Sequence, residues 1–222
     1  MNVLVACEES QAVATAFREN GHNAYSCDII PCSGNHSEYH IIHDVIPLLN
    51  GNCVFLTQNG NYHEIKGRWD MIIGFPPCTY LSITSAARMT IKGEINQQRY
   101  EKAIEAKEFF MNILNADCEK IAVENPTPLK LVKLPEYSQA IQPWQFGHPY
   151  TKRTCLWLKN LPLLKPTNIY NGETTPWVNA GNRDKNGEYR KKKGPTTRDP
   201  RQRAKTFPGI AKAMADQWGG KI

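Results

Sequence analysis

NVLVACEESQAVATAFRENGHNAYSCDII (residues 2–30) is a short apolar run, then an amphipathic stretch, then a second apolar run. Residues 2–6 form a short apolar run with β-branched side chains, which predicts a strand that is buried on both faces. Residues 10–21 place apolar side chains on one helical face, with Ser10 as the expected N-cap and Gly21 just past the last turn. Residues 23–30 predict a second strand, which carries Asp28. The order strand, turn, helix, strand predicts the start of a parallel sheet.

The rest of the chain continues this alternation. Strands are expected at 69–75, 120–126 and 153–161, helices at 97–116 and 204–218, and a short apolar run at 40–49 contains Asp44. The pattern predicts an α/β protein of Rossmann-like fold, with a mostly parallel sheet covered by helices on both faces. An acid on the second strand of such a sheet, here Asp28, is placed to bind the ribose hydroxyls of a nucleotide cofactor.

Length and composition narrow the class of protein. The 222 residues are enough for one sizeable α/β domain. No apolar run reaches the length of a membrane span, and the N-terminus lacks the basic region of a signal peptide. Seven widely scattered cysteines argue against a disulfide scaffold and favour a reducing, cytoplasmic setting.

Positive charge is concentrated near the C-terminus. Residues 183–205 contain ten Lys/Arg and three Asp/Glu, a net charge of +7 that leaves the rest of the chain at −1. Such a cluster favours a polyanionic partner, with nucleic acid first among them, although a solvated loop has a similar composition. We expect 165–203 to be a basic loop or a minimal nucleic-acid-binding insert between a catalytic domain (1–164) and a C-terminal helix (204–222). The expected contacts are Lys191, Lys192, Lys193, Arg198, Arg201 and Arg203.

Reactive side chains follow several of the predicted strands. Cys7-Glu8-Glu9, Asp28, Cys78 and Glu124-Asn125 all lie at strand ends, and open α/β sheets bind ligands outside the carboxyl ends of their strands. Cys78 lies in DMIIGFPPCTYLS (70–82); taken alone, this stretch favours a packing cysteine over a nucleophile. A carboxyl such as Glu124 at a neighbouring strand end would donate or accept a proton beside the nucleophile's target.

In this order, these segments resemble the DNA cytosine-5 methyltransferases, which use S-adenosylmethionine. Residues 70–82 are similar to that family's catalytic loop, and VENP (123–126) to its Glu-Asn motif. QFGHPYTKRTCLWLKN (145–160) resembles the segment that leads into its arginine-bearing strand, and RQRAKTFPG (201–209) the stretch before its final helix. GHNAYSCDII (21–30) and HDV (43–45) resemble the segments that contact the ribose and the adenine of the cofactor.

The resemblance implies a methyltransferase fold, a DNA substrate and a covalent mechanism. The Cys78 thiolate would attack C6 of a cytosine that is flipped out of a duplex or already single-stranded. Glu124 would bind the N3 side of the base, Asn125 would brace the catalytic loop, and Lys152 or Arg153 would contact the base carbonyl or a phosphate. The residues implied for S-adenosylmethionine are Cys7, Glu8, Glu9, Ser10, Asp28, Ile29, Asp44, Val45 and Pro76.

Two features depart from the family pattern. The family's first motif is a glycine-containing turn, whereas residues 7–11 contain no glycine; the methionine end of the cofactor must therefore sit differently or bind weakly. The chain also has no large target-recognition domain. We therefore expect weak or very short sequence preference, as in a compact phage or mobile-element enzyme.

Three alternatives remain open at this stage. The missing glycines favour a non-catalytic nucleic-acid-binding protein with a degenerate methyltransferase fold. An enzyme of the same fold could instead act on free nucleotide or RNA, or transfer another group. The cluster Cys32, His36, His40 and His43 suggests zinc, but it lacks the paired spacing of structural zinc sites, so no metal is expected.

Overall fold

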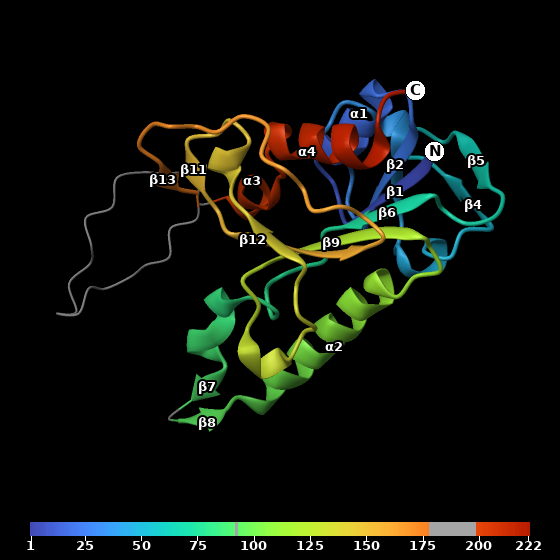
Figure 1. Ribbon diagram of the computed structural model, residues 1–222. Helices are drawn as coiled ribbons and strands as arrows, with labels where there is room; N and C mark the ends of the chain where they lie inside the picture. Colours follow the sequence, from blue (N-terminus) through green and yellow to red (C-terminus); the bar gives the residue numbers. More distant parts are fainter. Residues whose placement is uncertain (92, 178–198) are drawn as a thin grey trace.

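The computed structural model describes residues 1–91, 93–177 and 199–222 (Figure 1). Its helices are α1 (Ala12–Glu19), α2 (Gln97–Leu114), α3 (Pro200–Ala204) and α4 (Pro208–Met214). Its strands are β1 (Asn2–Ala6), β2 (Asn23–Asp28), β3 (His40–Ile42), β4 (Cys53–Leu56), β5 (Tyr62–Ile65), β6 (Met71–Gly74), β7 (Thr90–Ile91), β8 (Glu94–Ile95), β9 (Lys120–Pro126), β10 (Gln139–Ile141), β11 (Tyr150–Thr151), β12 (Thr154–Lys159) and β13 (Thr175–Pro176).

In the described ranges, the main sheet has seven strands in the order β10-β12-β9-β6-β1-β2-β3. The five strands from β9 to β3 are parallel, and β12 runs antiparallel to both of its neighbours. The chain order reverses between β1 and β6, which is the topological switch point where open sheets bind ligands. The α/β class and the mostly parallel sheet are therefore confirmed.

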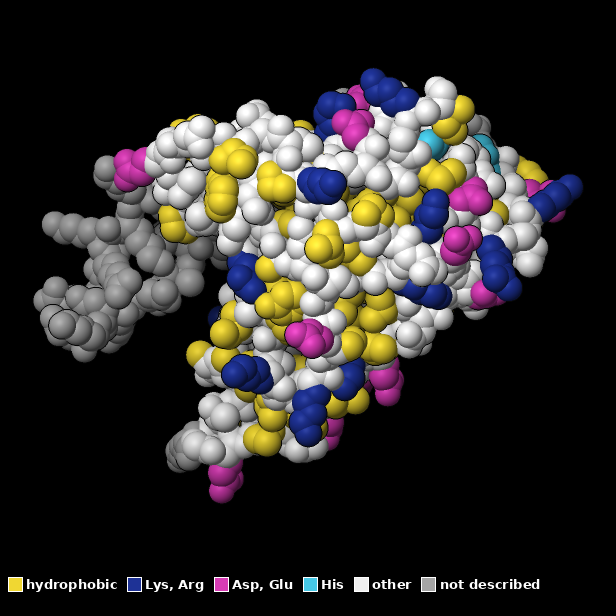
Figure 2. Space-filling model, viewed as in Figure 1, with side chains coloured by type: hydrophobic (Ala, Val, Ile, Leu, Met, Phe, Trp, Pro, Cys, Tyr) yellow, Lys and Arg dark blue, Asp and Glu magenta, His cyan; other side chains and the backbone are white. Residues whose placement is uncertain are grey.

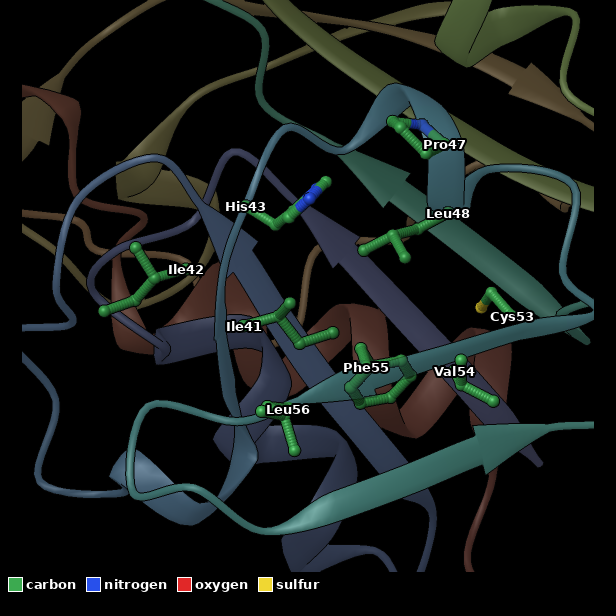
Figure 3. A pocket seen from close by; sticks show the side chains of 9 residues that line it. All are labelled: Ile41, Ile42, His43, Pro47, Leu48, Cys53, Val54, Phe55 and Leu56. Carbon is green, nitrogen blue, oxygen red and sulfur yellow. The ribbon is translucent and has the colours of Figure 1, made fainter.

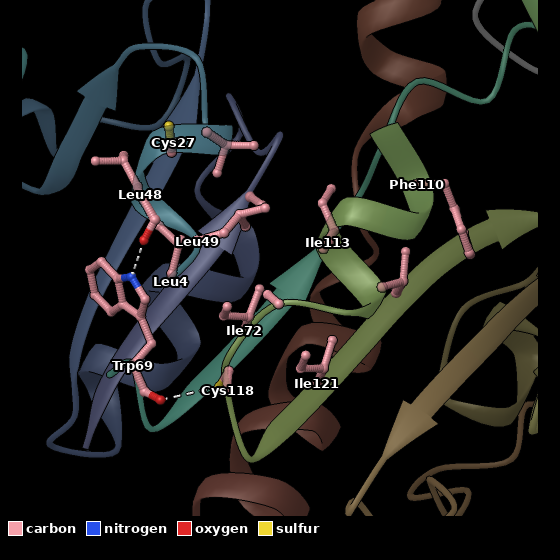
Figure 4. Close-up of a cluster of buried hydrophobic side chains, with 14 of the residues drawn as sticks. Leu4, Cys27, Leu48, Leu49, Trp69, Ile72, Phe110, Ile113, Cys118 and Ile121 are labelled. Carbon is pink, nitrogen blue, oxygen red and sulfur yellow. Dashed lines mark hydrogen bonds between the residues drawn. The ribbon is translucent and has the colours of Figure 1, made fainter. Parts of the chain in front are cut away.

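Apolar side chains on both faces of the sheet explain why it is covered on both sides. In β1, Leu4 and Ala6 face the core beneath α2, whereas Val3 and Val5 face the core beneath α1 and α4. Figure 4 shows the first of these cores, in which the Trp69 indole donates to the Leu48 carbonyl oxygen at 2.7 Å. The alternation along a strand places successive side chains in different cores.

The start of α1 differs from the expectation. The prediction that Ser10 is the N-cap is wrong. The helix begins after Gln11, and the Gln11 side chain makes no capping hydrogen bond. Glu8 supplies the cap instead, since its two carboxylate oxygens accept from the Val13 and Ala14 amides at 2.6 and 3.1 Å. A carboxylate suits this position because helix N-termini carry unpaired N–H groups and partial positive charge.

Three elements lie outside the expected pattern. The β4–β5 hairpin packs beside the edge strand β3, and β10 pairs with the predicted strand β12 at the opposite edge of the sheet. The segment η3 (Ile83–Arg88) and the β7–β8 hairpin project from the sheet beside the first turns of α2 (Figure 1). We call residues 83–91 and 93–99 the projecting lobe. Among the described residues, none of the helices combines the length and apolar composition of a membrane span.

Candidate active site

The carboxyl edge of the sheet gathers three of the predicted catalytic residues. Cys78 follows the end of β6, and Glu124 lies near the end of β9, the next strand in the sheet. Lys152 precedes the antiparallel strand β12, whose first residue, Thr154, pairs with Pro126. Because β12 begins where the parallel strands end, Lys152 reaches the same edge as the other two.

Main-chain hydrogen bonds hold the loop that carries Cys78. The Cys78 carbonyl oxygen accepts from the Leu81 and Ser82 amides, both at 3.1 Å. Two further bonds join this loop to the segment after β9, from the Ile83 amide to the Thr127 carbonyl and from the Leu129 amide to the Leu81 carbonyl. The loop is therefore attached to the strand that carries Glu124.

Glu124 and Lys152 are close enough to influence the Cys78 thiol. Burial raises the pKa of Cys78, the carboxyl of Glu124 raises it further, and the cationic Lys152 and Arg203 side chains lower it. Burial also raises the pKa of Glu124, against the opposing effect of Lys152. At rest, both the thiol and the carboxyl therefore hold their protons more tightly than in water.

A small cavity is lined by two members of this group, Glu124 and Lys152. Its volume is about 10 Å³, room for about one water molecule. Its walls come from the strand ends and from α4, and the lining residues are Phe75, Glu124, Lys152, Thr154, Thr206, Phe207, Ile210 and Met214. The Glu124 Oε1 atom is buried and has no hydrogen-bond partner among the described residues. Buried carboxyl oxygens without partners are rare, and they mark places where a ligand can complete the bonding.

Three of the predicted catalytic residues make contacts outside the cavity. The exposed Arg153 side chain donates to the Tyr137 hydroxyl at 2.8 Å, while the Lys152 Nζ donates to the Arg203 carbonyl at 3.0 Å. The Asn125 amide donates to the adjacent Pro126 carbonyl, so in this structure main-chain bonds, and not this amide, hold the loop around Cys78.

The other half of the sheet edge is acidic. The Asp28 and Asp44 carboxylates raise the pKa of the Cys7 thiol, which burial raises most. Asp28 itself has a raised pKa, because burial and the charge of Glu9 outweigh the hydrogen bonds from the Ile29 and Ile30 amides. The ends of β1, β2 and β3 therefore bring Cys7, Glu9, Asp28 and Asp44 within electrostatic reach of one another.

The remaining cofactor residues of the prediction differ in their accessibility. Ile29, next to Asp28, is 75% exposed. Val45 and Pro76 are buried, and Ser10 is half-buried. The carboxylate of Glu8 is engaged with α1, and that of Glu9 accepts from the Ser33 amide at 3.1 Å.

The turn between β1 and α1 has the backbone of a glycine turn without its glycines. Cys7 and Gln11 have φ angles of 59° and 60°, in the left-handed region that glycine occupies most easily. Gln11 is held there by its buried amide, which donates to the His36 carbonyl at 2.8 Å and to the Ser26 hydroxyl at 3.2 Å. Side-chain bonding thus keeps a conformation that glycine would adopt unaided.

Of the predicted nucleic-acid contacts, Arg201 and Arg203 belong to α3, and Lys152 bonds to the backbone of that helix. Lys191, Lys192, Lys193 and Arg198 lie outside the described residues. The division into 1–164, 165–203 and 204–222 stays a prediction, although α4 packs against α1 on one face of the sheet.

The histidines of the 32–43 segment make protein contacts. His40 is fully buried; its Nδ1 atom is 2.8 Å from the Ser26 hydroxyl and its Nε2 atom is 2.9 Å from the Ile30 carbonyl oxygen. The described residues contain no group of three or more His, Cys, Asp or Glu side chains placed to hold a metal ion.

Two features were missed by reasoning from sequence. A cavity of about 360 Å³ lies between β3 and the β4–β5 hairpin, lined by Ile41, Ile42, His43, Pro47, Leu48, Cys53, Val54, Phe55 and Leu56 (Figure 3). An aromatic cluster, Tyr150, Trp177, Phe207 and His148, packs behind the wall of the small cavity. The continuous apolar run at 53–56 is a signal for the first strand of the hairpin, whereas the aromatic residues are scattered along the chain.

Comparison with known proteins gave structural matches only. No family model matches the chain, and no curated protein does. A solved structure described as a DNA modification methyltransferase encoded within an E. coli prophage aligns with 76% of this chain at 14% identity and a TM-score of 0.42. The methyltransferase EhMeth of Entamoeba histolytica aligns with 79% at 12% identity and a TM-score of 0.38. The chain covers 51% and 58% of those two structures.

Proposed function

We propose that this protein is an S-adenosylmethionine-dependent methyltransferase that acts on C5 of cytosine in DNA. One observation carries the proposal: Glu124 and Lys152, which both act on the Cys78 thiol, line a small cavity, and a buried oxygen of Glu124 has no hydrogen-bond partner among the described residues. A nucleophile, a proton donor and a cation within electrostatic reach of one another match what attack on a pyrimidine ring requires.

The chemistry needs a proton at N3 when sulfur adds to C6. The raised pKa of Glu124 keeps its carboxyl protonated closer to neutral pH, so that it can donate to N3 as the Cys78 Sγ–C6 bond forms. Electrons then move toward C5, which becomes nucleophilic. S-adenosylmethionine, when bound, supplies the electrophilic methyl group. Loss of the C5 proton to a base, cleavage of the Sγ–C6 bond and return of the N3 proton to Glu124 restore both ring and enzyme.

Lys152 supports the first step. Its ammonium group lowers the pKa of Cys78 and so favours the thiolate, which is the attacking species. The bond from Lys152 Nζ to the Arg203 carbonyl couples this charge to α3. Because the cavity holds about one water molecule, its walls, which include Phe207 and Ile210 of the α4 region, must separate to admit a base.

The acidic groups at the carboxyl ends of β1, β2 and β3 suit S-adenosylmethionine, the methyl donor. S-adenosylmethionine carries a sulfonium and an ammonium charge, which the field of Glu9, Asp28 and Asp44 favours. Asp28 would hold the ribose hydroxyls, and the exposed Ile29 would lie against the adenine. A dinucleotide fits less well, because its pyrophosphate would need the N-terminus of α1, which Glu8 already caps.

The test is covalent trapping. With S-adenosylmethionine present, DNA containing 5-fluorocytosine should form an adduct with Cys78, because fluorine cannot leave C5 as a proton does. Denaturing electrophoresis followed by peptide mass spectrometry locates the adduct. Wild-type protein that forms no adduct, or Cys78→Ala that forms as much, would overturn the proposal. Mass spectrometry of nucleosides from treated DNA identifies the base and the transferred group.

A further inference from the structure

Arg99 lies beside the loop that carries Cys78, and the mechanism above does not use it. It is in the first turn of α2, where the Asn96 side chain accepts from its backbone amide. Its guanidinium carbon is 4.9 Å from the centre of the Tyr80 ring, two residues beyond Cys78 in the chain. A cation stacked on an aromatic face in this way is held in place.

The Arg99 charge has no counter-charge among the described residues. None of the ion pairs found there includes it, and its buried Nε atom has no hydrogen-bond partner. A partly desolvated guanidinium without an acceptor is costly, and such groups are usually satisfied by a carboxylate, water or a bound anion. The side chain is half-buried, which leaves part of it accessible from outside.

The surroundings of Arg99 favour an anion that reaches Cys78. The projecting lobe contains β7, β8 and the start of α2, and over the lower part of the molecule hydrophobic side chains lie among Lys, Arg, Asp and Glu side chains (Figure 2). Lys152 and Arg203 already provide positive charge at Cys78 from the β12 and α3 side. Tyr80 joins Arg99 to the loop of the nucleophile itself.

We propose that Arg99 binds a phosphate of the nucleic acid next to the target cytosine. The inference rests on the proposed function and deepens it, because it requires a substrate that carries a phosphate beside the reacting base. The planar guanidinium matches phosphate oxygens with two parallel hydrogen bonds, and stacking on Tyr80 prevents the side chain from swinging away. Fixing this phosphate would orient the nucleotide whose base enters the cavity.

Binding of an oligonucleotide that contains one 5-fluorocytosine tests the proposal without using turnover. Fluorescence anisotropy at several salt concentrations gives the slope of log K against log salt. The slope is negative, and loss of one phosphate contact should make it less steep by about 0.9 for a duplex, or about 0.7 for a single strand. We expect Arg99→Gln to lose about tenfold in affinity and to show this smaller slope. Lys102→Gln, which removes an exposed charge from the same helix, should retain the wild-type slope.

A neutral methylphosphonate beside the cytosine identifies the phosphate. Wild-type protein should bind that oligonucleotide about tenfold more weakly, whereas Arg99→Gln should show no further loss. Tyr80→Phe keeps the aromatic face and should behave as wild type. Thermal denaturation of each variant shows whether the fold is retained.

The outcomes separate the two proposals. Wild-type protein that forms the covalent adduct, while Arg99→Gln keeps the wild-type slope and methylphosphonate sensitivity, overturns the role of Arg99 alone. An equal slope change in Lys102→Gln overturns it too, because the effect would then come from overall charge. Wild-type protein that neither binds the oligonucleotide nor forms an adduct overturns both.

Discussion

The two halves of the sheet's carboxyl edge carry opposite charge. Beside β1, β2 and β3, the acids Glu9, Asp28 and Asp44 surround the end of the first strand. Beside β6, β9 and β12, Lys152 and Arg203 lower the pKa of Cys78, and Lys152 also lowers that of the buried Glu124. The boundary falls at the switch point between β1 and β6. The carboxyl edge of the sheet can therefore hold a cationic methyl donor beside an anionic methyl acceptor.

The cysteines of the two halves show the same contrast. Cys7 and Cys78 each follow a central strand, and burial raises the pKa of both. Nearby acids raise the pKa of Cys7 further, and cations partly offset the rise for Cys78. Each cysteine follows an apolar strand in the sequence. The charged groups on neighbouring strands therefore distinguish the two thiols, because they set how readily each thiol loses its proton.

The largest expected effect comes from removing the proton donor of the basic half. Glu124→Gln should lower single-turnover methyl transfer by roughly 10²- to 10⁴-fold, because an amide of the same shape cannot give N3 a proton. The variant should melt within a few degrees of wild type. Turnover within tenfold of wild type would remove Glu124 from the chemistry.

The acidic half is tested by donor binding. Asp28→Asn should weaken binding of S-adenosylmethionine by about ten- to a hundredfold, since hydrogen bonds to a charged group are lost. Isothermal titration calorimetry measures the change directly. Asp70→Asn is the matched control: this exposed acid precedes β6 at the opposite edge of the sheet and accepts from the Asn2 amide. Equal losses in both variants would contradict a donor site beside Asp28.

Lys152 and Arg153 are adjacent in sequence but act in different places. Lys152→Gln should raise the pKa of Cys78, so that alkylation of this cysteine by iodoacetamide becomes severalfold slower at neutral pH and its rate rises at higher pH. Arg153→Gln should leave the profile unchanged, because its guanidinium contacts Tyr137. Site-specific mass spectrometry follows the alkylation, and identical profiles for the two variants would contradict the assignment.

The smallest effect concerns His148, which packs against the cavity residue Phe207. His148 Nε2 accepts from the Gly209 amide at 3.0 Å, at the start of α4, so this bond needs a neutral ring. Burial lowers the pKa of His148, and folding therefore loses stability as pH falls below the ordinary histidine value of about 6.5.

His148→Gln keeps an acceptor and removes the titration. Between pH 7.5 and 5.5, wild type should lose about 1 kcal/mol more unfolding free energy than this variant. Urea titrations at both pH values measure the difference. His36→Gln, at an exposed site, should follow wild type; a wild-type loss equal to that of His148→Gln would show that the bond does not depend on protonation.

Several elements could be predicted from sequence because their signals are local. The strand at 2–6 and the strand at 120–126 have the predicted bounds, and the helix expected at 97–116 ends two residues early. Hydrophobic periodicity and strand-end residues are properties of short windows. The cap of α1 was mispredicted because a buried carboxylate from the preceding turn competes with Ser10 and makes two bonds.

Glycine placement shows the limit of motif reasoning. The absence of glycine at 7–11 predicted that the methionine end of the cofactor sits differently or binds weakly, and this stays a prediction; in the structure, Cys7 and Gln11 of this turn adopt positive φ. Gln11 does so because its side chain bonds to residues brought in by β2 and the loop after it. A backbone conformation can therefore survive the loss of the residue that usually favours it, when tertiary contacts hold it.

By itself, the sequence determined which residues form strands, which acids and thiols end them, and where positive charge collects. Only the tertiary structure decided which strand ends are neighbours, that β12 runs antiparallel, and that Lys152 and not Arg153 reaches the cavity. The reason is physical. Strand formation follows from side chains a few positions apart, whereas strand order and side-chain burial depend on packing between segments that are distant in the chain.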